Sequence, residues 1–353
     1  MKSKYIYLIS LIIFILNLVL KLSYITYSDI GLDEPFTIFH SQQSISNIFN
    51  MLKTENNPPI FFLFSHLWIK LFGISPFAVR LPSVIFSSLA SVLLFQIGNK
   101  YFNIYTGLIC SVFFSFSNLH LFYSYDFRVY SLFILLYLIH TILLFYIFQK
   151  KLTNFPTNKK YIFAFIIANI LLLYSHFFAI IILTFEILIL FLFNNYGKLY
   201  KSIIVYNIIS LGSFIFYLPL LLSRFNSTMG HGWIPKPIIS DLYTMIWRYC
   251  NQPLIACIAI LILFYGLFSN TKEFKNNLYY KFNVLMFFLP YIFLFLISLI
   301  IPVFIDRYLL FLSINFYILI SFNFYLTFKY FKFKNAIFFH YCPTKLQIIS
   351  IVS

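Results

Sequence analysis

Long apolar segments, each with few charges, constrain this chain more than any other feature. An α-helix needs about 20 apolar residues to cross the hydrocarbon of a bilayer. Such segments lie at about residues 5–25, 80–98, 104–123, 129–148, 161–174, 177–193, 201–222, 253–268, 281–300 and 308–328. A membrane β-barrel would instead show alternating segments about ten residues long. We therefore predict an all-α polytopic membrane protein with about ten transmembrane helices and both termini on one side.

The composition supports this class and narrows the partners. Of 353 residues, 61% are hydrophobic and 10% are charged, which is more apolar surface than a water-soluble fold would hide. The net charge of +16 does not indicate nucleic-acid binding, because the lysines lie in short loops and no arginine-rich arm is present. The first apolar segment lacks a small-residue cleavage site, so we expect an uncleaved helix rather than a signal peptide.

The charges divide unequally between the two sides of the predicted bundle. With the N-terminus in the cytoplasm, the inner loops hold most of the lysines and no arginine, which satisfies the positive-inside rule. The outer loops hold every arginine and most of the nine acidic residues. Arginine binds carboxylates and phosphates well. We therefore expect a multi-pass protein of the inner or plasma membrane whose chemistry lies on the extracytoplasmic side.

Two outer loops are long enough to carry structure. The first, residues 26–79, contains an amphipathic stretch, Ile45–Leu52, and a short apolar piece, Ile60–Phe72, both typical of interfacial helices. The second, residues 223–252, includes an expected interfacial helix with Trp247 and Arg248. We assign residues 1–335 to one transmembrane domain and residues 336–353 to a tail, which a truncated end would also explain.

The strongest candidate for a catalytic group is the acidic pair in Gly31-Leu32-Asp33-Glu34, just beyond the first apolar segment. A carboxylate costs about 2.5–3.5 kcal/mol at the centre of a membrane helix, so acids near a membrane are candidates for function. Partial desolvation raises a carboxylate pKa toward the range useful for a general base. An acidic pair in a solvated loop is the structural alternative.

Further candidates lie in other outer turns. A turn with many tyrosines carries Asp126, Arg128 and Tyr130, and the last apolar segment opens with Arg307-Tyr308. These residues suit an anionic headgroup, although Asp126 and Arg128 also suit a local ion pair and Arg307 an interfacial anchor. Arg80, in Arg80-Leu81-Pro82-Ser83, offers the same choice between phosphate contact and anchor, with Pro82 suited to a first helical turn.

The sequence carries little sign of a metal or cofactor. His176 lies on an outer turn, where it could contact a substrate or simply be structural. His-x-x-His spacing, the His-Glu-x-x-His motif, glycine-rich phosphate loops and dinucleotide fingerprints are all missing. We predict no metal site and no cofactor, and leave a divalent cation open.

Several motifs, taken in order, resemble the polytopic C-type glycosyltransferases, in the branch of protein O-mannosyltransferases and bacterial lipid A aminoarabinose transferases. The Asp-Glu pair follows the first span. Further matches are Asn57-Pro58-Pro59-Ile60 with Trp68, then Phe72-Gly73, Arg80-Leu81-Pro82-Ser83, the turn with Tyr125, Arg128 and Tyr130, and Arg307-Tyr308-Leu309-Leu310. The resemblance runs from about residue 5 to 328 and rests on the ordered set.

The resemblance implies an enzyme that transfers a sugar from a polyprenyl phosphate to an acceptor hydroxyl with inversion. Asp33 would be the base, supported by Glu34, while Arg128 and Arg307 would bind the departing phosphate. The acceptor is a lipid, a glycan or a protein. The alternative is a transporter or flippase for an anionic glycolipid, which should show charges deep in its spans or paired broken helices. A third reading is a catalytically inactive relative with a structural role.

Overall fold

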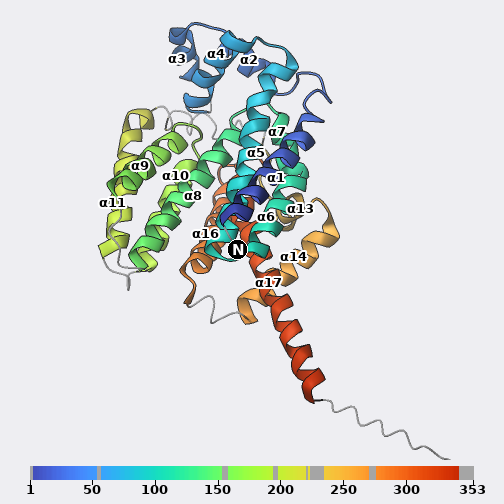
Figure 1. The fold of residues 1–353 in the computed structure, drawn as a ribbon. Coiled ribbons are helices and arrows are strands. Elements are labelled where there is room, and N and C mark those ends of the chain that lie inside the picture. The colour runs from blue at the N-terminus through green and yellow to red at the C-terminus, as the bar shows by residue number, and fades with distance from the viewer. Residues whose placement is uncertain are drawn as a thin grey trace, which may run out of the picture.

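The computed structural model describes residues 3–53, 57–152, 158–193, 198–219, 222, 234–269 and 276–341. Within these ranges the regular structure is entirely helical (Figure 1). The helices are α1 (Ser3–Leu22), α2 (Glu34–Ser41), α3 (Ile45–Leu52), α4 (Ile60–Phe72), α5 (Pro76–Tyr101), α6 (Ile104–Phe116), α7 (Asn118–Tyr125), α8 (Tyr130–Leu152), α9 (Lys159–Leu173), α10 (Ala179–Leu192), α11 (Lys198–Ser213), η2 (Phe214–Tyr217), α13 (Asp241–Cys250), α14 (Pro253–Ser269), α16 (Leu278–Ser298) and α17 (Leu310–Tyr341).

Each of the ten expected spans contains a helix, but the expected number of spans is not confirmed. Six helices of the described chain are long and apolar enough to cross a membrane, or up to eight if two bent pairs each count as one. The bent pairs are α6 with α7, at 61°, and α13 with α14, at 102°. The helices α9 and α10 have 15 and 14 residues, which is short for a span.

The expected interfacial pieces also form helices. The amphipathic stretch is α3, the short apolar piece is α4, and Trp247 and Arg248 lie on α13. Residues 223–233 of the late loop and 342–353 of the tail lie outside the described residues. Helix α17 continues to Tyr341, into the segment assigned to the tail.

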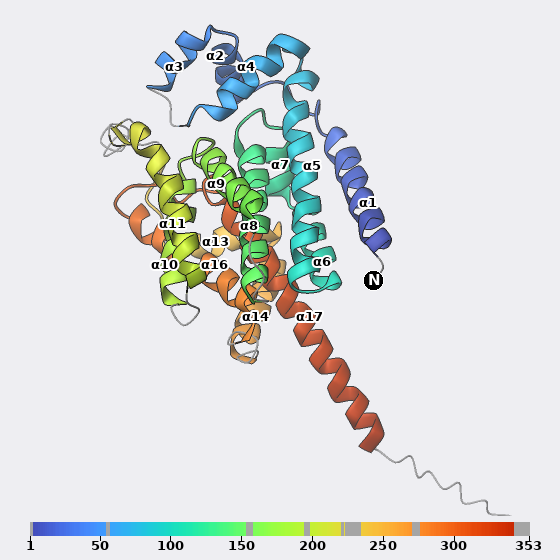
Figure 2. The same ribbon diagram turned by 60° about the vertical axis from the view of Figure 1, so that its left-hand side comes forward.

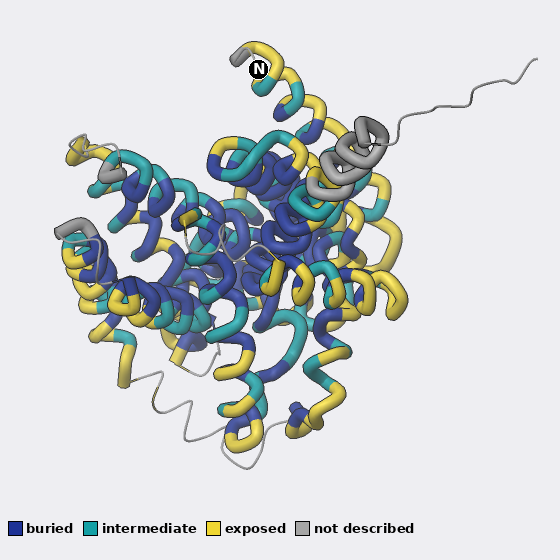
Figure 3. The backbone as a smooth tube through the Cα atoms, turned by 90° about the horizontal axis from the view of Figure 1, so that it is seen from below, coloured by how far each residue is buried: buried dark blue, intermediate teal, exposed yellow. Residues whose placement is uncertain are grey.

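The core of the bundle lies around α8 and α17, whose spans are mostly buried, whereas α1 exposes most of its surface (Figure 3). The α5–α6 hairpin depends on two glycines. A Cβ added at Gly98 would lie 2.5 Å from the Cα of Gly107, so a larger residue would push the helices apart. Asn103 caps α6 by accepting from the Thr106 amide at 2.9 Å.

Helix α5 begins earlier than the sequence suggested, at a Ser75 cap followed by Pro76. Pro82 therefore lies inside the helix rather than in its first turn, and it cannot donate to the carbonyl of Ala78 four residues earlier. The indole N–H of Trp68 on α4 donates to that carbonyl at 2.8 Å. The carbonyl that lacks its hydrogen bond within α5 thus binds α4 instead.

The turns that carry the predicted site residues gather at one end of the bundle, beside α2, α3 and α4 (Figure 2). We call it the α2–α4 end. It receives the end of α1, the α7–α8 and α9–α10 turns, and the start of α17. The amide of Ile60 donates to the carbonyl of Tyr174 at 3.1 Å, which ties α4 to the α9–α10 turn.

Four buried polar side chains form a ring between α8, α9, α10 and α11. His140 Nδ1 lies 2.6 Å from Asn169 Oδ1, and Asn169 donates to Asn207 at 2.9 Å. Asn207 donates to one oxygen of Glu186 at 2.8 Å, and the other oxygen lies 2.8 Å from His140 Nε2. Each carboxylate oxygen of the buried Glu186 therefore has a polar side chain beside it.

Candidate active site

Asp33 stands at the start of α2, where the chain is strained. Leu32 before it has φ 55°, one of two non-glycine residues with positive φ in the described chain, and is 84% exposed. This conformation costs an L-residue roughly 1–2 kcal/mol, and such strain is concentrated at functional sites. Asp33 is the N-cap of α2, but its carboxylate makes no capping hydrogen bond. Its side chain is therefore available for other partners.

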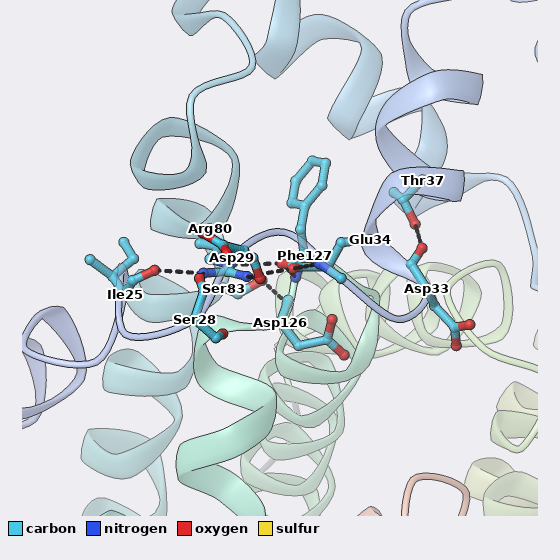
Figure 4. A network of polar contacts seen from close by, with 11 residues as sticks. Ile25, Ser28, Asp29, Asp33, Glu34, Thr37, Arg80, Ser83, Asp126 and Phe127 are labelled. Atoms are coloured by element: carbon cyan, nitrogen blue, oxygen red, sulfur yellow. Dashed lines mark hydrogen bonds and ion pairs between the residues drawn. The ribbon is translucent and has the colours of Figure 1, made fainter.

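Glu34 is a buried anchor rather than an exposed helper. Arg80 donates to both of its oxygens, from Nε at 2.8 Å and from Nη2 at 2.6 Å. The backbone amides of Phe127 and Gly31 donate to Glu34 as well, at 2.9 and 3.3 Å (Figure 4). Glu34 thus joins α5, the α7–α8 turn and its own loop, and fixes the backbone that presents Asp33.

Arg80 has no N–H left for a phosphate. Besides Glu34 it donates to three backbone carbonyls of the segment between α1 and α2, those of Ile25, Ser28 and Asp29, at 2.7–2.9 Å. These contacts use all five donors of the guanidinium. The side chain is 2% exposed, so it is not an interfacial anchor either. Arg80 instead clamps the loop that carries the acidic pair.

The carboxylate of Asp33 turns away from this clamp, as Figure 4 shows. Its partner is Arg307, just before α17, whose Nη1 lies 2.9 Å from Asp33 Oδ2. The two side chains are 49% and 20% exposed, far more than Glu34 and Arg80. The Arg307 guanidinium also lies 5.5 Å from the ring centre of Tyr308.

Asp33 and Arg307 lie on the wall of a cavity of about 650 Å³. The volume falls within the range of about 300–1,000 Å³ that is usual for ligand sites. The lining residues come from four turns and from α7, the start of α8 and α13: Leu32, Asp33, Phe122, Tyr123, Asp126, Tyr130, Pro235, Pro237, Asp241, Thr244, Met245, Arg248, Phe304, Ile305, Asp306 and Arg307. The cavity therefore brings together four of the candidate residues, Asp33, Asp126, Tyr130 and Arg307.

Asp126 is the third carboxyl group of this site. Burial and the nearby charge of Glu34 raise its pKa to about 7, against the opposing effect of Arg128. Its backbone carbonyl accepts from Ser83 on α5 at 2.9 Å. Near neutral pH, Asp126 can therefore hold or release a proton beside Asp33.

His176 lies among aromatic rings next to the two predicted phosphate ligands. Its Nδ1 accepts from the Phe178 amide at 3.2 Å, so a neutral ring carries its proton on Nε2. Burial lowers its pKa to about 3, with Arg128 and Arg307 acting in the same direction. The ring centre lies 5.9 Å from that of Tyr308 and 6.1 Å from that of Tyr130. His176 can donate a hydrogen bond but is not a base at neutral pH.

Arg128 lies behind the cavity wall. Its side chain is buried, and Nη1 donates to the hydroxyl of Thr37 on α2 at 2.8 Å. Arg128 does not line the cavity. Of the two predicted phosphate ligands, Arg307 is therefore the one that a cavity ligand reaches directly.

Among the cavity residues that sequence reasoning did not predict are Arg248 and Asp306. They form an ion pair between α13 and the segment before α17. Asp306 also accepts from the backbone amide of Arg307 at 2.8 Å and from the hydroxyl of Tyr123 at 3.4 Å. The adjacency of Asp306 to Arg307 was the signal available in the sequence.

The described residues hold no group of three or more His, Cys, Asp and Glu side chains arranged for a metal ion. The ionic groups of the cavity instead pair with one another, Asp33 with Arg307 and Asp306 with Arg248. This arrangement suits an anionic ligand that competes for the arginines.

Comparison with known proteins places this geometry in context. The family model of dolichyl-phosphate-mannose-protein mannosyltransferases matches residues 56–222. The solved structure of ArnT from Cupriavidus metallidurans bound to undecaprenyl phosphate is similar, with a TM-score of 0.56 and 10% identity. The alignment covers 91% of this chain and 59% of the ArnT chain, so this chain spans less than two thirds of that protein. No match was found among curated protein sequences.

The family match covers the end of the outer loop from residue 56, Arg80 and the Asp126–Tyr130 turn, but not the Asp33-Glu34 pair. The fold likeness extends over nearly the whole chain. The resemblance that the ordered motifs predicted is confirmed. The chain is thus a multi-pass membrane protein that is similar to the dolichyl-phosphate-mannose-protein mannosyltransferases over residues 56–222 and to ArnT in its fold.

Proposed function

We propose that this protein transfers a sugar from a polyprenyl phosphate donor to an acceptor hydroxyl, with Asp33 as the base. The observation that carries the proposal is the pairing of Asp33 and Arg307 on the wall of one cavity, with their atoms 2.9 Å apart. A base and an anion-binding group are the two functions that this reaction requires. The undecaprenyl phosphate bound to ArnT supports a lipid-phosphate donor.

The reaction is a single displacement. Asp33 takes the proton of the acceptor hydroxyl, the oxygen attacks the anomeric carbon, and the bond from that carbon to the phosphate oxygen breaks. The electron pair leaves with the polyprenyl phosphate, and the anomeric configuration inverts. A phosphate leaves without protonation by a second acid, unlike the leaving group of a glycoside hydrolase.

Positive charge stabilises the departing phosphate. Arg307 supplies this charge at the cavity wall, whereas His176 is buried and does not line the cavity. Arg128 contributes positive charge from behind the wall. Tyr130 and Tyr308 flank these groups, while Glu34 and Arg80 act through the backbone that they hold.

The positions of the lysines indicate how the protein is oriented in the membrane. In the described chain, Lys4, Lys100, Lys150, Lys159 and Lys281 lie toward the end opposite α2–α4. Lysine-rich ends face the cytoplasm. We therefore assign the cavity to the extracytoplasmic side of the cell membrane and the N-terminus to the cytoplasm. The acceptor is a lipid, glycan or protein that reaches this side.

Two observations bear on the transporter alternative. Bent helix pairs and a buried Glu186–His140 pair are features expected of a transporter. However, the two bends are pinned to each other, because the Asn251 side chain donates to the Phe116 carbonyl at 2.7 Å and accepts from the Asn118 amide at 2.8 Å. This clasp opposes a rocking motion and favours the enzyme.

Mass analysis of envelope glycolipids, glycans and proteins from cells with and without the gene tests the function. The proposal predicts that one sugar modification disappears without the gene, while its polyprenyl-phosphate donor accumulates. Disappearance of the modification with the lipid-linked sugar retained in the inner leaflet would instead favour the flippase.

A further inference from the structure

In this structure the proposed base is bonded to the proposed phosphate ligand. Arg307 Nη1 donates to Asp33 Oδ2 at 2.9 Å, and Arg307 is the one side-chain partner of Asp33 within the described chain. While Arg307 donates to it, Asp33 Oδ2 is not available to an acceptor hydroxyl, and Arg307 Nη1 is not available to a phosphate. The two roles therefore conflict while the pair is closed.

The neighbouring pair shows what a permanent ion pair looks like in this fold. The carboxylate of Glu34 receives four donors, and the guanidinium of Arg80 uses all five of its N–H groups. Asp33 receives one donor on its carboxylate, and half of its side chain is exposed to the cavity. The Asp33–Arg307 pair thus has the geometry of an interaction that a ligand can replace.

A phosphate is a natural competitor for Arg307. It presents oxygen acceptors as a carboxylate does, carries more charge, and matches the planar fork of the guanidinium. The groups around Arg307 would stay in place during an exchange. Its backbone amide is held by the carboxylate of Asp306.

We propose, on the basis of the proposed function, that the donor phosphate displaces Asp33 from Arg307 and so releases the base only when the donor is bound. The free enzyme then holds its base in an ion pair, and the donor must bind before the acceptor can be deprotonated. After transfer, Asp33 carries the acceptor proton and is neutral, so it cannot recapture Arg307 until that proton leaves. Product release and proton release are therefore linked.

The test is the affinity of the purified full-length protein for undecaprenyl phosphate in nanodiscs, with undecaprenol as the uncharged reference lipid. Asp33→Asn removes the competing carboxylate, so the variant should bind the phosphate more tightly than the wild type. A partly exposed ion pair contributes about 0.2–1 kcal/mol, which corresponds to a gain of up to about fivefold. Asp33→Ala serves as a second variant that also removes the hydrogen-bond acceptor.

The matched control is Asp241→Asn. Asp241 lines the same cavity, but its carboxylate accepts from the backbone amide of Ile238 rather than from an arginine. Competition predicts no gain for this variant, and it predicts that Asp33→Asn gives no gain when Arg307 is already alanine. An equal gain for Asp241→Asn, or unchanged or weaker binding by Asp33→Asn, would overturn the exchange.

The outcome separates the exchange from the proposed function. If the wild type does not prefer undecaprenyl phosphate to undecaprenol, the lipid-phosphate donor itself is wrong. If the wild type shows the preference and Asp33→Asn does not bind more tightly, the donor site stands and the exchange alone fails.

Discussion

In two regions of this molecule a carboxylate pairs with a basic side chain, and the two pairs differ in burial and in the number of their polar partners. Between α8 and α11, Glu186 lies in a ring with His140, Asn169 and Asn207, all fully buried, and the ring closes on itself. At the α2–α4 end, Asp33 meets Arg307 at the wall of a cavity and is half exposed. The ring uses its polar groups to hold four helices together, whereas the open pair leaves capacity for a ligand.

The same contrast separates two adjacent residues. Glu34 and Asp33 follow one another in sequence, but Glu34 is saturated by Arg80 and backbone amides, and Asp33 is not. A residue whose hydrogen-bonding groups are all occupied fixes the fold, whereas a residue on a cavity wall with unused hydrogen-bonding capacity can react. Four substitutions test this distinction.

The largest effect is expected for Arg80→Ala, which leaves the buried carboxylate of Glu34 unpaired. Breaking one side of a buried ion pair costs about 3–5 kcal/mol of unfolding free energy. Denaturation of the purified protein in detergent measures this loss. Glu34→Gln with Arg80→Ala should recover part of it, and a melting transition unchanged from wild type would show that the clamp is dispensable.

Arg307→Ala should have the opposite effect to Arg80→Ala. It should cause a large loss of activity and little loss of stability. Removing a group that stabilises developing charge lowers the rate about 10²–10³-fold. The rate of sugar transfer per folded molecule is the measurement. Arg307→Lys should recover part of the rate, and a loss of folding as large as that of Arg80→Ala would contradict the open-pair account.

Glu186→Ala breaks the closed ring and leaves His140 and Asn207 without their partner. Buried polar groups left unsatisfied cost about 1–3 kcal/mol. We expect a lower melting temperature, with the transfer rate per folded molecule unchanged. Glu186→Gln retains an acceptor for Asn207 and should lose less. An inactive but stable Glu186→Ala would give the ring a role in transport or catalysis.

The smallest effect is expected for Asp126→Asn and concerns pH. The folded pKa of Asp126 is raised to about 7, so between about pH 4 and 7 the folded protein keeps a proton that the unfolded chain releases. Wild-type stability should therefore fall as pH rises through this window. In Asp126→Asn the melting temperature should fall less steeply there. Identical slopes in both proteins would show that Asp126 is not held protonated.

The sequence predicted the helical class and much of the candidate site, for identifiable reasons. Apolar segments reveal helices without any tertiary information, and the ordered motifs placed Asp33, Tyr130 and Arg307 on one side. The partners of each charge could not be predicted. Arg80 offers the same side chain as Arg307, and only the approach of three carbonyls and Glu34 makes it structural. Likewise, the partners of Glu186 lie on other helices and cannot be inferred from its own apolar segment.

The most direct test of the central claim is single-turnover transfer by the purified protein in vesicles, with undecaprenyl-phosphate hexose as donor. Envelope extract from cells lacking the gene supplies the acceptor, and the measurements are released undecaprenyl phosphate and the anomeric configuration of the product. The account predicts inversion by the wild type, and a rate for Asp33→Asn lower by about 10²–10⁴-fold with the donor still bound. Transfer by Asp33→Asn at the wild-type rate, or a product with retained configuration, would contradict it.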